Sequence, residues 1–127
     1  MKLFKIIFLL IALIAAPFLF SQEQVRSKKE IEDMLIVAGD AFFDLKCQKS
    51  LQISQKALYH AHQINDDALM AKAYNVIGLN FDEFIDPKKS IVYYQKSVYH
   101  AKKINNDTIL GWTYNNLGNV YTCRKID

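Results

Sequence analysis

Apolar positions occur in two patterns along the chain, one continuous and one periodic. Residues 6–20 form an unbroken apolar run without a charged or hydrogen-bonding side chain. Beyond residue 30, apolar and small residues recur every three or four positions, as in the set Tyr74, Ile77, Gly78 and Phe81. That spacing places side chains on one face of an α-helix. With only 4 Gly and 2 Pro in 127 residues, the pattern predicts an all-α chain rather than a turn-rich β fold.

Short polar segments mark the ends of the expected helices. Asp86 followed by Pro87 is a start signal, because Asp accepts hydrogen bonds from free N–H groups and Pro suits the first helical turn. The segment 105–107 (NND) predicts the end of one helix and the start of the next, and the segment 65–67 (NDD) repeats this signal. We therefore expect antiparallel helices joined by short turns.

The chain contains an internal repeat, which appears when residues 50–87 are aligned with residues 90–127. In this alignment 12 of the 38 pairs are identical, against about two or three expected by chance. The identities include the segment 59–61 (YHA) with 99–101 and the pair Gly78 with Gly118. Many other pairs are conservative exchanges. Each unit therefore holds the same two helices.

Small residues at repeated positions predict close packing between helices. Gly78 and Gly118 lie in helix interiors, where Gly is less favourable than Ala by about 1 kcal/mol. Because this unfavourable residue recurs at the same position of the repeat, we expect a neighbouring helix close to each glycine. The expected partners are the small residues of the second helix: Ser50, Ala57, Ser90 and Ser97. Aromatic residues are expected to fill the remaining gaps: Tyr74, Phe81, Tyr94, Tyr114 and Tyr121.

These features resemble the tetratricopeptide repeat (TPR) family. Residues 114–121 (YNNLGNVY) are similar to the first-helix signature of that family, and residues 90–98 (SIVYYQKSV) to its second helix. The chain departs from the family in using Ser where Ala is usual, Tyr74 and Tyr114 where Trp is favoured, and a longer unit than the usual one of about 34 residues. The longer unit is similar to units of bacterial sensor and regulator proteins. The resemblance implies stacked antiparallel helix pairs in a right-handed superhelical solenoid.

The resemblance divides the chain into about two and a half repeats. The units are expected at about 31–70, 71–110 and 111–127, and the last one is incomplete. A lone helix near 108–123 then carries apolar residues without the polar cap that usually ends such an array: Trp112, Leu117, Val120 and Tyr121. We expect the N-terminal fragment of a longer protein, which is marginally stable or self-associates through this helix.

The segment 1–21 is typical of a secretory signal peptide. Lys2 and Lys5 precede the apolar run and the small residue Ser21 ends it, so cleavage is expected after Ser21, with 22–30 left as a polar lead-in. The alternative is an uncleaved membrane anchor, although the run is shorter than the about 20 apolar residues that span a bilayer. Either outcome predicts an exported chain, periplasmic or secreted after cleavage.

No motif for catalysis, phosphate binding or metal binding stands out in the sequence. His60 and His100 hold equivalent repeat positions, which favours a structural role, and His60 and His62 point to different sides of a helix. Cys47 and Cys123 lie two repeats apart, which exceeds the reach of a disulfide and predicts free thiols. A formal charge of only +3 argues against a nucleic-acid partner. We expect no enzymatic activity, cofactor or metal in this chain.

The resemblance also implies a binding surface, because the family lines its concave wall with the first helix of each pair. By position, seven residues of this chain belong to that wall: Lys72, Asn75, Leu79, Asp82, Trp112, Asn115 and Asn119. Asn side chains hydrogen-bond extended backbones, and an exposed Trp is a common anchor. The expected role is protein or peptide recognition. The alternative is the sensory ectodomain of a membrane signalling protein, such as a sensor histidine kinase, with membrane contact only through an uncleaved leader or a downstream segment.

Overall fold

The computed structural model describes residues 1, 4–7 and 24–124 of the chain. Its packed part consists of helices, and a π-helical turn, η1, follows the third of them. The elements are α2 (Lys28–Phe43), α3 (Cys47–Gln63), α4 (Asp67–Asn80), η1 (Phe81–Ile85), α5 (Pro87–Lys103) and α6 (Asp107–Cys123). The described residues include no strand, so the predicted all-α class is confirmed.

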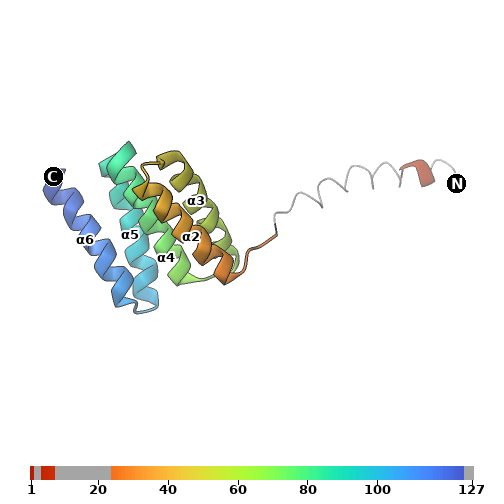
Figure 1. Cartoon of the computed structure of the whole chain (residues 1–127). Helices are drawn as coiled ribbons and strands as arrows, with labels where there is room; N and C mark the ends of the chain where they lie inside the picture. Colours follow the sequence, from red (N-terminus) through yellow and green to blue (C-terminus); the bar gives the residue numbers. More distant parts are fainter. Residues whose placement is uncertain (2–3, 8–23, 125–127) are drawn as a thin grey trace.

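Consecutive helices pack side by side as antiparallel hairpins (Figure 1). Each helix contacts the next one along the chain, and α4 also contacts both α2 and α6. The helices therefore form two rows, with α2, α4 and α6 in one row and α3 and α5 in the other. As a result, the first helices of all the predicted pairs lie on the same side of the molecule.

Side-chain caps explain where α5 and α6 begin. The Asp86 carboxylate accepts hydrogen bonds from two backbone N–H groups in the first turn of α5, and Pro87 is the first residue of that helix. The Asn106 side chain accepts from the Ile109 N–H at 3.0 Å and caps α6 in the same manner. Both starts that the sequence predicts are confirmed.

Three of the four turns between consecutive helices contain one residue in the left-handed conformation. Asn65 (φ 52°) and Asn105 (φ 50°) hold this position after α3 and α5. Asn tolerates a left-handed backbone better than most residues, and one such residue after the last helical turn closes the helix end. The repeated Asn therefore ends each second helix, as the sequence predicts. Leu45 (φ 59°) holds the same position after α2.

The first helix of every unit begins earlier than the predicted boundaries at residues 31, 71 and 111. The α2 helix begins at Lys28 because Ser27 and Glu30 cap each other: Ser27 Oγ accepts from the Glu30 N–H, and the Glu30 carboxylate accepts from the Ser27 N–H at 2.8 Å. The α4 and α6 helices begin at Asp67 and Asp107. The α4 and α6 helices therefore begin at the polar segments 65–67 and 105–107, which the sequence marks as helix starts.

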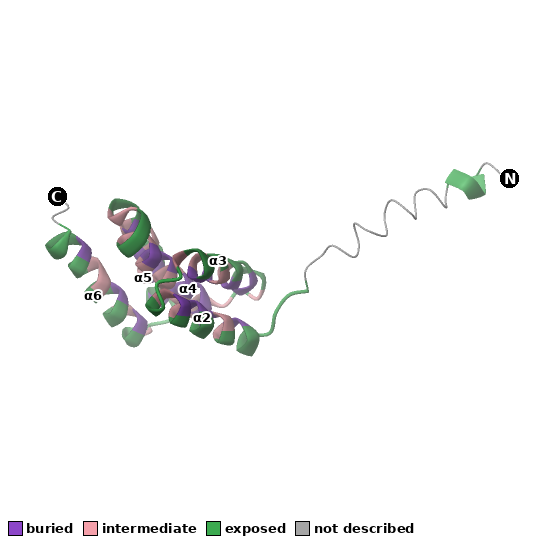
Figure 2. Ribbon diagram, turned by 45° about the horizontal axis from the view of Figure 1, so that its top comes forward, coloured by how far each residue is buried: buried purple, intermediate pink, exposed green. Residues whose placement is uncertain are grey.

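The core lies between the helices, where buried residues face one another (Figure 2). One apolar cluster joins α2, α3 and α4: Ile31, Leu35, Ala57, Ala61, Leu69, Met70 and Ala73. A smaller cluster joins α4, α5 and α6 through Ala71, Ala101 and Ile109. Small residues are prominent in both clusters, which lets the helix axes approach closely.

Gly78 confirms the predicted close approach, but with a different partner. A Cβ atom added at Gly78 would lie only 2.6–2.7 Å from two ring carbons of Tyr94, a fully buried residue of α5. The expected partners, Ser90 and Ser97, are buried elsewhere on α5, and Ser97 Oγ lies 3.0 Å from Thr113 Oγ1 of α6. A large aromatic ring therefore fills the space that the missing Cβ leaves.

Gly118 does not show the predicted contact. A Cβ atom at this position would meet nothing within 4 Å among the described residues. The aromatic residues beside it are also uncovered, because Tyr114 is 48% and Tyr121 is 46% exposed. The expectation that these two tyrosines fill gaps between helices is wrong in this structure, whereas it holds for the fully buried Tyr94.

The expected signal peptide falls mostly outside the described residues. Within the segment 1–21 only residues 1 and 4–7 are described, and the predicted cleavage site after Ser21 is not among them. No helix in the described part of the chain is long and apolar enough to cross a membrane. Cys47, at the start of α3, and Cys123, at the end of α6, carry free thiols.

An ion-pair cluster joins the start of α4 to the end of α5. The Asp67 carboxylate lies 2.6 Å from His100 Nδ1 and 3.0 Å from Lys103 Nζ. Hydrogen bonds from His100, and then from Lys103, hold the pKa of the Asp67 carboxyl below its usual value. A carboxyl with a lowered folded-state pKa stabilises the fold above its unfolded-state pKa of about 3.9, and this stabilisation disappears as the pH falls through the folded-state value.

We expect Asp67→Asn to reduce the free energy of unfolding at pH 7 and to have a smaller effect at about pH 2.5, because the stabilisation by the charged carboxylate is progressively lost below the unfolded-state pKa. Urea denaturation of both proteins at the two pH values measures the difference. Asp107→Asn is the matched control, because Asp107 begins α6 at the equivalent repeat position but forms no ion pair with a described residue. If Asp67→Asn reduces the free energy of unfolding equally at both pH values, the charge of Asp67 does not stabilise the fold.

Candidate functional site

A groove runs across the row formed by α2, α4 and α6. Its volume is about 480 Å³, within the range of about 300–1,000 Å³ that is usual for ligand pockets. Residues from all three helices line it: Glu32, Leu35 and Ile36 from α2, Lys72, Asn75 and Val76 from α4, and Ile109 and Trp112 from α6. The groove is therefore built from the first helix of each predicted repeat.

The lining residues occupy equivalent positions of the internal repeat. Glu32, Lys72 and Trp112 are each separated by one repeat period, and Leu35 with Asn75 and Ile36 with Val76 are equivalent pairs. Equivalent residues of equivalent helices face the same side, because the helices stand in one row. The repeat thus presents three chemically different side chains, an acid, a base and an indole, at one structural position.

The groove contains charged groups that form no ion pair with a described residue. Neither Lys72 nor Glu32 forms an ion pair with a described residue. Trp112 is 55% exposed, which is high for the largest apolar side chain. Exposed tryptophan and uncompensated charge in one groove are typical of surfaces that bind a partner.

Asn75 is held in place by a residue of α6. Its Oδ1 atom accepts a hydrogen bond from Asn116 Nδ2 at 3.0 Å. This bond fixes the side-chain amide and leaves the Asn75 Nδ2 donor without a partner among the described residues. Asn75 lines the groove with an amide donor that no described residue uses, and Asn116 holds its side chain in place.

The structure brings together three of the seven residues predicted from the sequence. Lys72, Asn75 and Trp112 line the groove. The other four lie outside its lining: Leu79, Asp82, Asn115 and Asn119. Among these, Asn115 and Asn119 are exposed on α6, and Leu79 is half-buried near the end of α4.

Asp82 is engaged with the end of α6. Its Oδ1 atom lies 3.2 Å from Arg124 Nε, and the neighbouring Glu83 lies 2.6 Å from Arg124 Nη2. The negative charge of Asp82, more than that of Glu83, raises the pKa of the Arg124 guanidinium. These pairs link η1 to the end of α6, so Asp82 contributes to packing between units rather than to the groove.

The α2 side of the groove is not among the residues predicted from the sequence, and it consists of Glu32, Leu35 and Ile36. The signal for them is present in the repeat, because these three positions are the equivalents of Lys72, Asn75 and Val76 one period earlier. The hydrophobic residues are difficult to recognise as surface residues from pattern alone. Leu35 is in fact mostly buried, and only its edge contributes to the groove.

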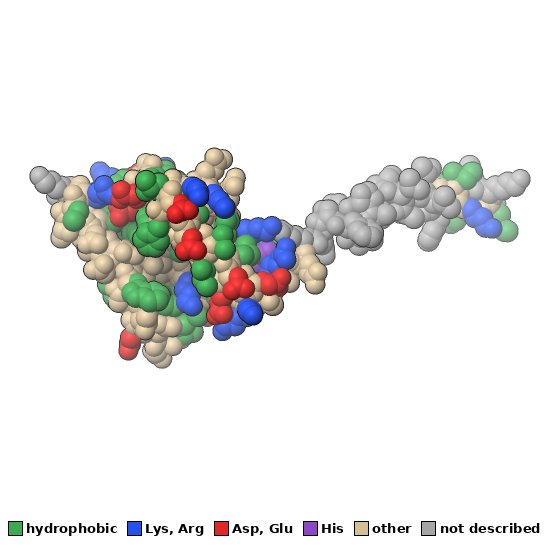
Figure 3. All heavy atoms as spheres, in the orientation of Figure 1, with side chains coloured by type: hydrophobic (Ala, Val, Ile, Leu, Met, Phe, Trp, Pro, Cys, Tyr) green, Lys and Arg blue, Asp and Glu red, His purple; other side chains and the backbone are tan. Residues whose placement is uncertain are grey.

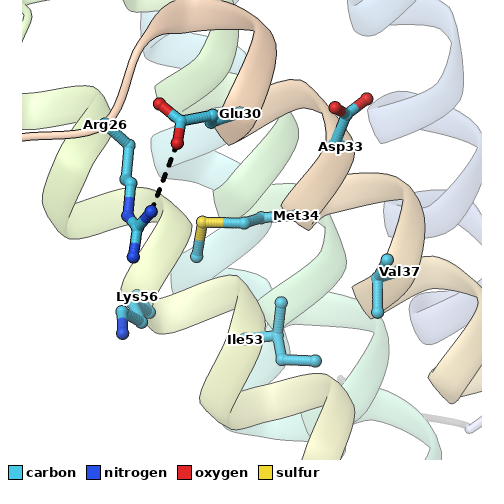
Figure 4. A pocket seen from close by; sticks show the side chains of 7 residues that line it. All are labelled: Arg26, Glu30, Asp33, Met34, Val37, Ile53 and Lys56. Carbon is cyan, nitrogen blue, oxygen red and sulfur yellow. Dashed lines mark hydrogen bonds and ion pairs between the residues drawn. The ribbon is translucent and has the colours of Figure 1, made fainter.

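A second hollow of about 450 Å³ lies against α2 and α3 (Figure 4). It combines apolar and charged side chains: Arg26, Glu30, Asp33, Met34, Val37, Ile53 and Lys56. Arg26 and Glu30 are paired at 3.2 Å, and Glu30 also belongs to the cap of α2. Since these two charged groups are already engaged, this hollow offers fewer groups to a ligand than the groove does.

Aromatic and titratable side chains gather between α3, α4 and α5. The Tyr74 ring stacks on His100 at 5.6 Å, and the Tyr74 hydroxyl lies 3.4 Å from His62 Nε2. The contacts agree with a structural role for His100, since its other neighbour is the Asp67 carboxylate. Within the described part of the chain, no group of three or more His, Cys, Asp or Glu side chains is arranged to hold a metal ion.

On the side of the molecule that Figure 3 shows, the surface charges do not form a single basic or acidic face. Figure 3 shows Lys and Arg side chains interspersed with Asp and Glu on the visible side of the helices. Such a mixed surface lacks the concentrated positive charge that phosphate backbones attract. The groove is distinguished by its exposed indole and by its unpaired Lys72 and Glu32.

Comparison with known proteins adds no assignment to this geometry. The chain matches no family model, no curated protein and no solved structure. A functional proposal therefore depends on the groove and on the internal repeat that builds it.

Proposed function

We propose that the chain is a non-catalytic interaction module whose groove binds an extended segment of a partner protein. The observation that supports this proposal most strongly is the composition of the α2–α4–α6 groove. It joins an exposed indole (Trp112), an unpaired ammonium (Lys72) and an amide donor that no described residue uses (Asn75) along one row of helices. These groups complement an apolar side chain, a carboxylate and a backbone carbonyl, which an extended peptide presents together.

We further propose that the helices form a TPR-like solenoid with a right-handed superhelical stack of about two and a half repeats. The internal repeat supports this arrangement, as does the contact of α4 with both α2 and α6. In such a stack each unit contacts only its neighbours, and one continuous wall arises from the first helices. The groove is the section of that wall that α2, α4 and α6 form.

The chemistry of the groove defines the preferred partner segment. An Asp or Glu side chain opposite Lys72 forms a charge-assisted hydrogen bond in a partly shielded site. A bulky apolar side chain packs between Trp112 and the apolar residues Ile36 and Val76. At the α2 end, Glu32 repels an acidic residue of the bound segment and favours a basic or neutral residue opposite it. The segment thus has one acidic and one apolar anchor in a fixed order.

The proposed location is outside the cytoplasm. This part of the proposal depends on the leader, in which the apolar run follows Lys2 and Lys5 and ends at Ser21. In an exported setting, the same groove suits either a scaffold or the sensory ectodomain of a membrane signalling protein. Both versions assign the same binding chemistry to the groove.

We expect Trp112→Ala to weaken binding of a selected peptide by about thirtyfold, equivalent to about 2 kcal/mol, because a Trp that a partner covers is a typical hot spot. Peptides are first selected against the chain from a display library of random linear sequences. Dissociation constants are then measured by fluorescence anisotropy. Lys72→Met is expected to weaken the binding of those peptides that contain an acidic residue. It is also expected to remove most of the salt dependence of their binding.

Asn119→Ala provides the control on the same helix, because Asn119 is exposed but lies outside the groove lining. Its affinity for the selected peptides is expected to equal that of the unaltered chain. The proposed function fails if no peptide is enriched, or if the peptides bind the Trp112→Ala and Lys72→Met proteins as tightly as the original.

A further inference from the structure

The α6 helix carries a copy of the α4 face that α5 covers. On α4 and the start of η1 this face consists of Tyr74, Ile77, Gly78 and Phe81. Its counterpart, one repeat period later, is the α6 end face, which we define as Tyr114, Leu117, Gly118 and Tyr121. The glycine and the first tyrosine are identical in the two faces, and the remaining pairs are conservative.

The α5 helix contacts the α4 face at several points along its length. The Tyr94 ring lies over Gly78, and the Tyr93 ring lies 4.6 Å from the ring of Phe81. Nearer the end of α5, His100 stacks on Tyr74. The contact ends in an ion pair, because His100 and Lys103 both bind Asp67 at the start of α4. Aromatic packing and charge pairing therefore act together along this interface.

The α6 end face has the same groups without their partners. Nothing among the described residues lies within 4 Å of a Cβ atom at Gly118, and about half of each tyrosine side chain is exposed. Leu117 is half-buried, whereas its counterpart Ile77 is 1% exposed. Asp107, the counterpart of Asp67, forms no ion pair with any described residue. The uncovered surface is thus apolar in the middle and acidic at the start of the helix.

The glycine indicates the size of the residue that this face accepts. In the first unit the equivalent pair is Ala38 with Ser54, two small residues that are both fully buried. In the second unit the pair is Gly78 with Tyr94, where the loss of Cβ makes room for a ring. Since the third unit again has glycine, at Gly118, its partner residue is expected to be aromatic.

We propose that the α6 end face binds an amphipathic helix with the pattern of α5. The helix places an aromatic side chain over Gly118 and a basic residue, six or nine positions later, against Asp107. Charge complementarity supports this occupant, because Asp67 takes His100 and Lys103 at the same spacing from Tyr94. This surface differs from the groove, which faces the row of first helices and contains Trp112.

The test uses the full chain and a fluorescein-labelled synthetic peptide with the sequence of residues 86–104, which includes all of α5. Fluorescence anisotropy is expected to show saturable binding of the peptide. Replacing Tyr94 by Ala in the peptide is expected to weaken binding at least about tenfold, because a buried aromatic contact is lost. Asp107→Asn in the chain is expected to weaken binding less and to reduce its salt dependence.

Gly118→Leu in the chain fills the position that the aromatic ring occupies, and binding of the peptide is expected to be lost. Far-UV circular dichroism checks that this variant folds, which is expected because Gly118 has open space around it. Gly39→Leu is the matched control, since Gly39 lies on α2 with equally open space. Its affinity for the peptide is expected to be unchanged.

Several outcomes overturn the proposal. One is the absence of saturable binding, and another is equal binding by the Tyr94→Ala peptide. Binding that survives Gly118→Leu places the peptide elsewhere, such as on α4 in exchange for α5. A concentration-dependent dimer that Gly118→Leu abolishes, in a chain that binds no peptide, assigns the face to a second copy instead. The peptides selected for the groove are expected to bind the Gly118→Leu chain as before. A failure of the α6 end face is then distinguishable from a failure of the proposed function.

Discussion

Replacing Tyr94 with alanine is expected to lower the free energy of unfolding by about 3–5 kcal/mol, the usual range for truncating a fully buried large aromatic residue. The Tyr94 side chain is fully buried between α4 and α5, and it fills the space beside Gly78. Because small domains are stable by only about 5–15 kcal/mol, the variant is expected to unfold at much lower urea concentrations. Urea denaturation followed by circular dichroism measures the change.

Tyr94→Phe separates the ring from the hydroxyl. The Tyr94 hydroxyl is buried without a hydrogen-bond partner among the described residues, and burial, followed by the charge of Asp82, raises its pKa. Removing a buried hydroxyl that makes no hydrogen bond removes no stabilising interaction. We therefore expect Tyr94→Phe to be at least as stable as the original chain. A loss comparable to that of Tyr94→Ala would show that the hydroxyl, and not the ring, stabilises this interface.

Alanine at the two equivalent glycines is expected to change stability in opposite directions. At Gly78 the new methyl group meets the Tyr94 ring at 2.6 Å, and overpacking of this kind destabilises by about 1–3 kcal/mol. At Gly118 the methyl group enters open space, so the better helix propensity of Ala stabilises α6 by up to about 1 kcal/mol. Urea midpoints of the two variants, measured side by side with the original chain, test both signs.

The comparison also reports whether the α6 end face is covered. Destabilisation by Gly118→Ala as large as that by Gly78→Ala would mean that a ring lies on Gly118 under the conditions of the measurement. Stabilisation by Gly78→Ala would contradict the tight contact with Tyr94. The two glycines hold the same position within the repeat, so the difference isolates the effect of the neighbouring helix.

Most of the secondary structure is predictable from the sequence because its signals are local. Asp86 and Asn106 cap their helices through hydrogen bonds to residues two or three positions away. Asn65 and Asn105 end helices through their own backbone conformation. Such effects act within one helical turn, so residue type and spacing are sufficient to locate them. The α2 helix begins earlier than predicted because the Ser27–Glu30 capping box lies within the segment expected to be a polar lead-in.

The candidate groove is predictable only in part. The family resemblance implies Lys72, Asn75 and Trp112 as wall residues, and these three line one groove in the structure. Asp82 is predicted for the same wall as these three residues. Its carboxylate is instead paired with Arg124, which lies far away in the sequence. No local pattern indicates a pair of that separation. The role of Asn116 in orienting Asn75 is missed for the same reason.

The order, type and approximate bounds of the helices follow from the sequence, because periodicity, caps and turn residues depend on near neighbours. The internal repeat also implies that equivalent helices face the same side. Only the tertiary structure distinguished residues that the repeat makes equivalent. Gly78 lies under a ring and Gly118 does not, and Asp67 is paired whereas Asp107 has no ion-pair partner among the described residues. These differences arise from contacts between separate helices, and a contact of that kind depends on which helix is packed beside each face.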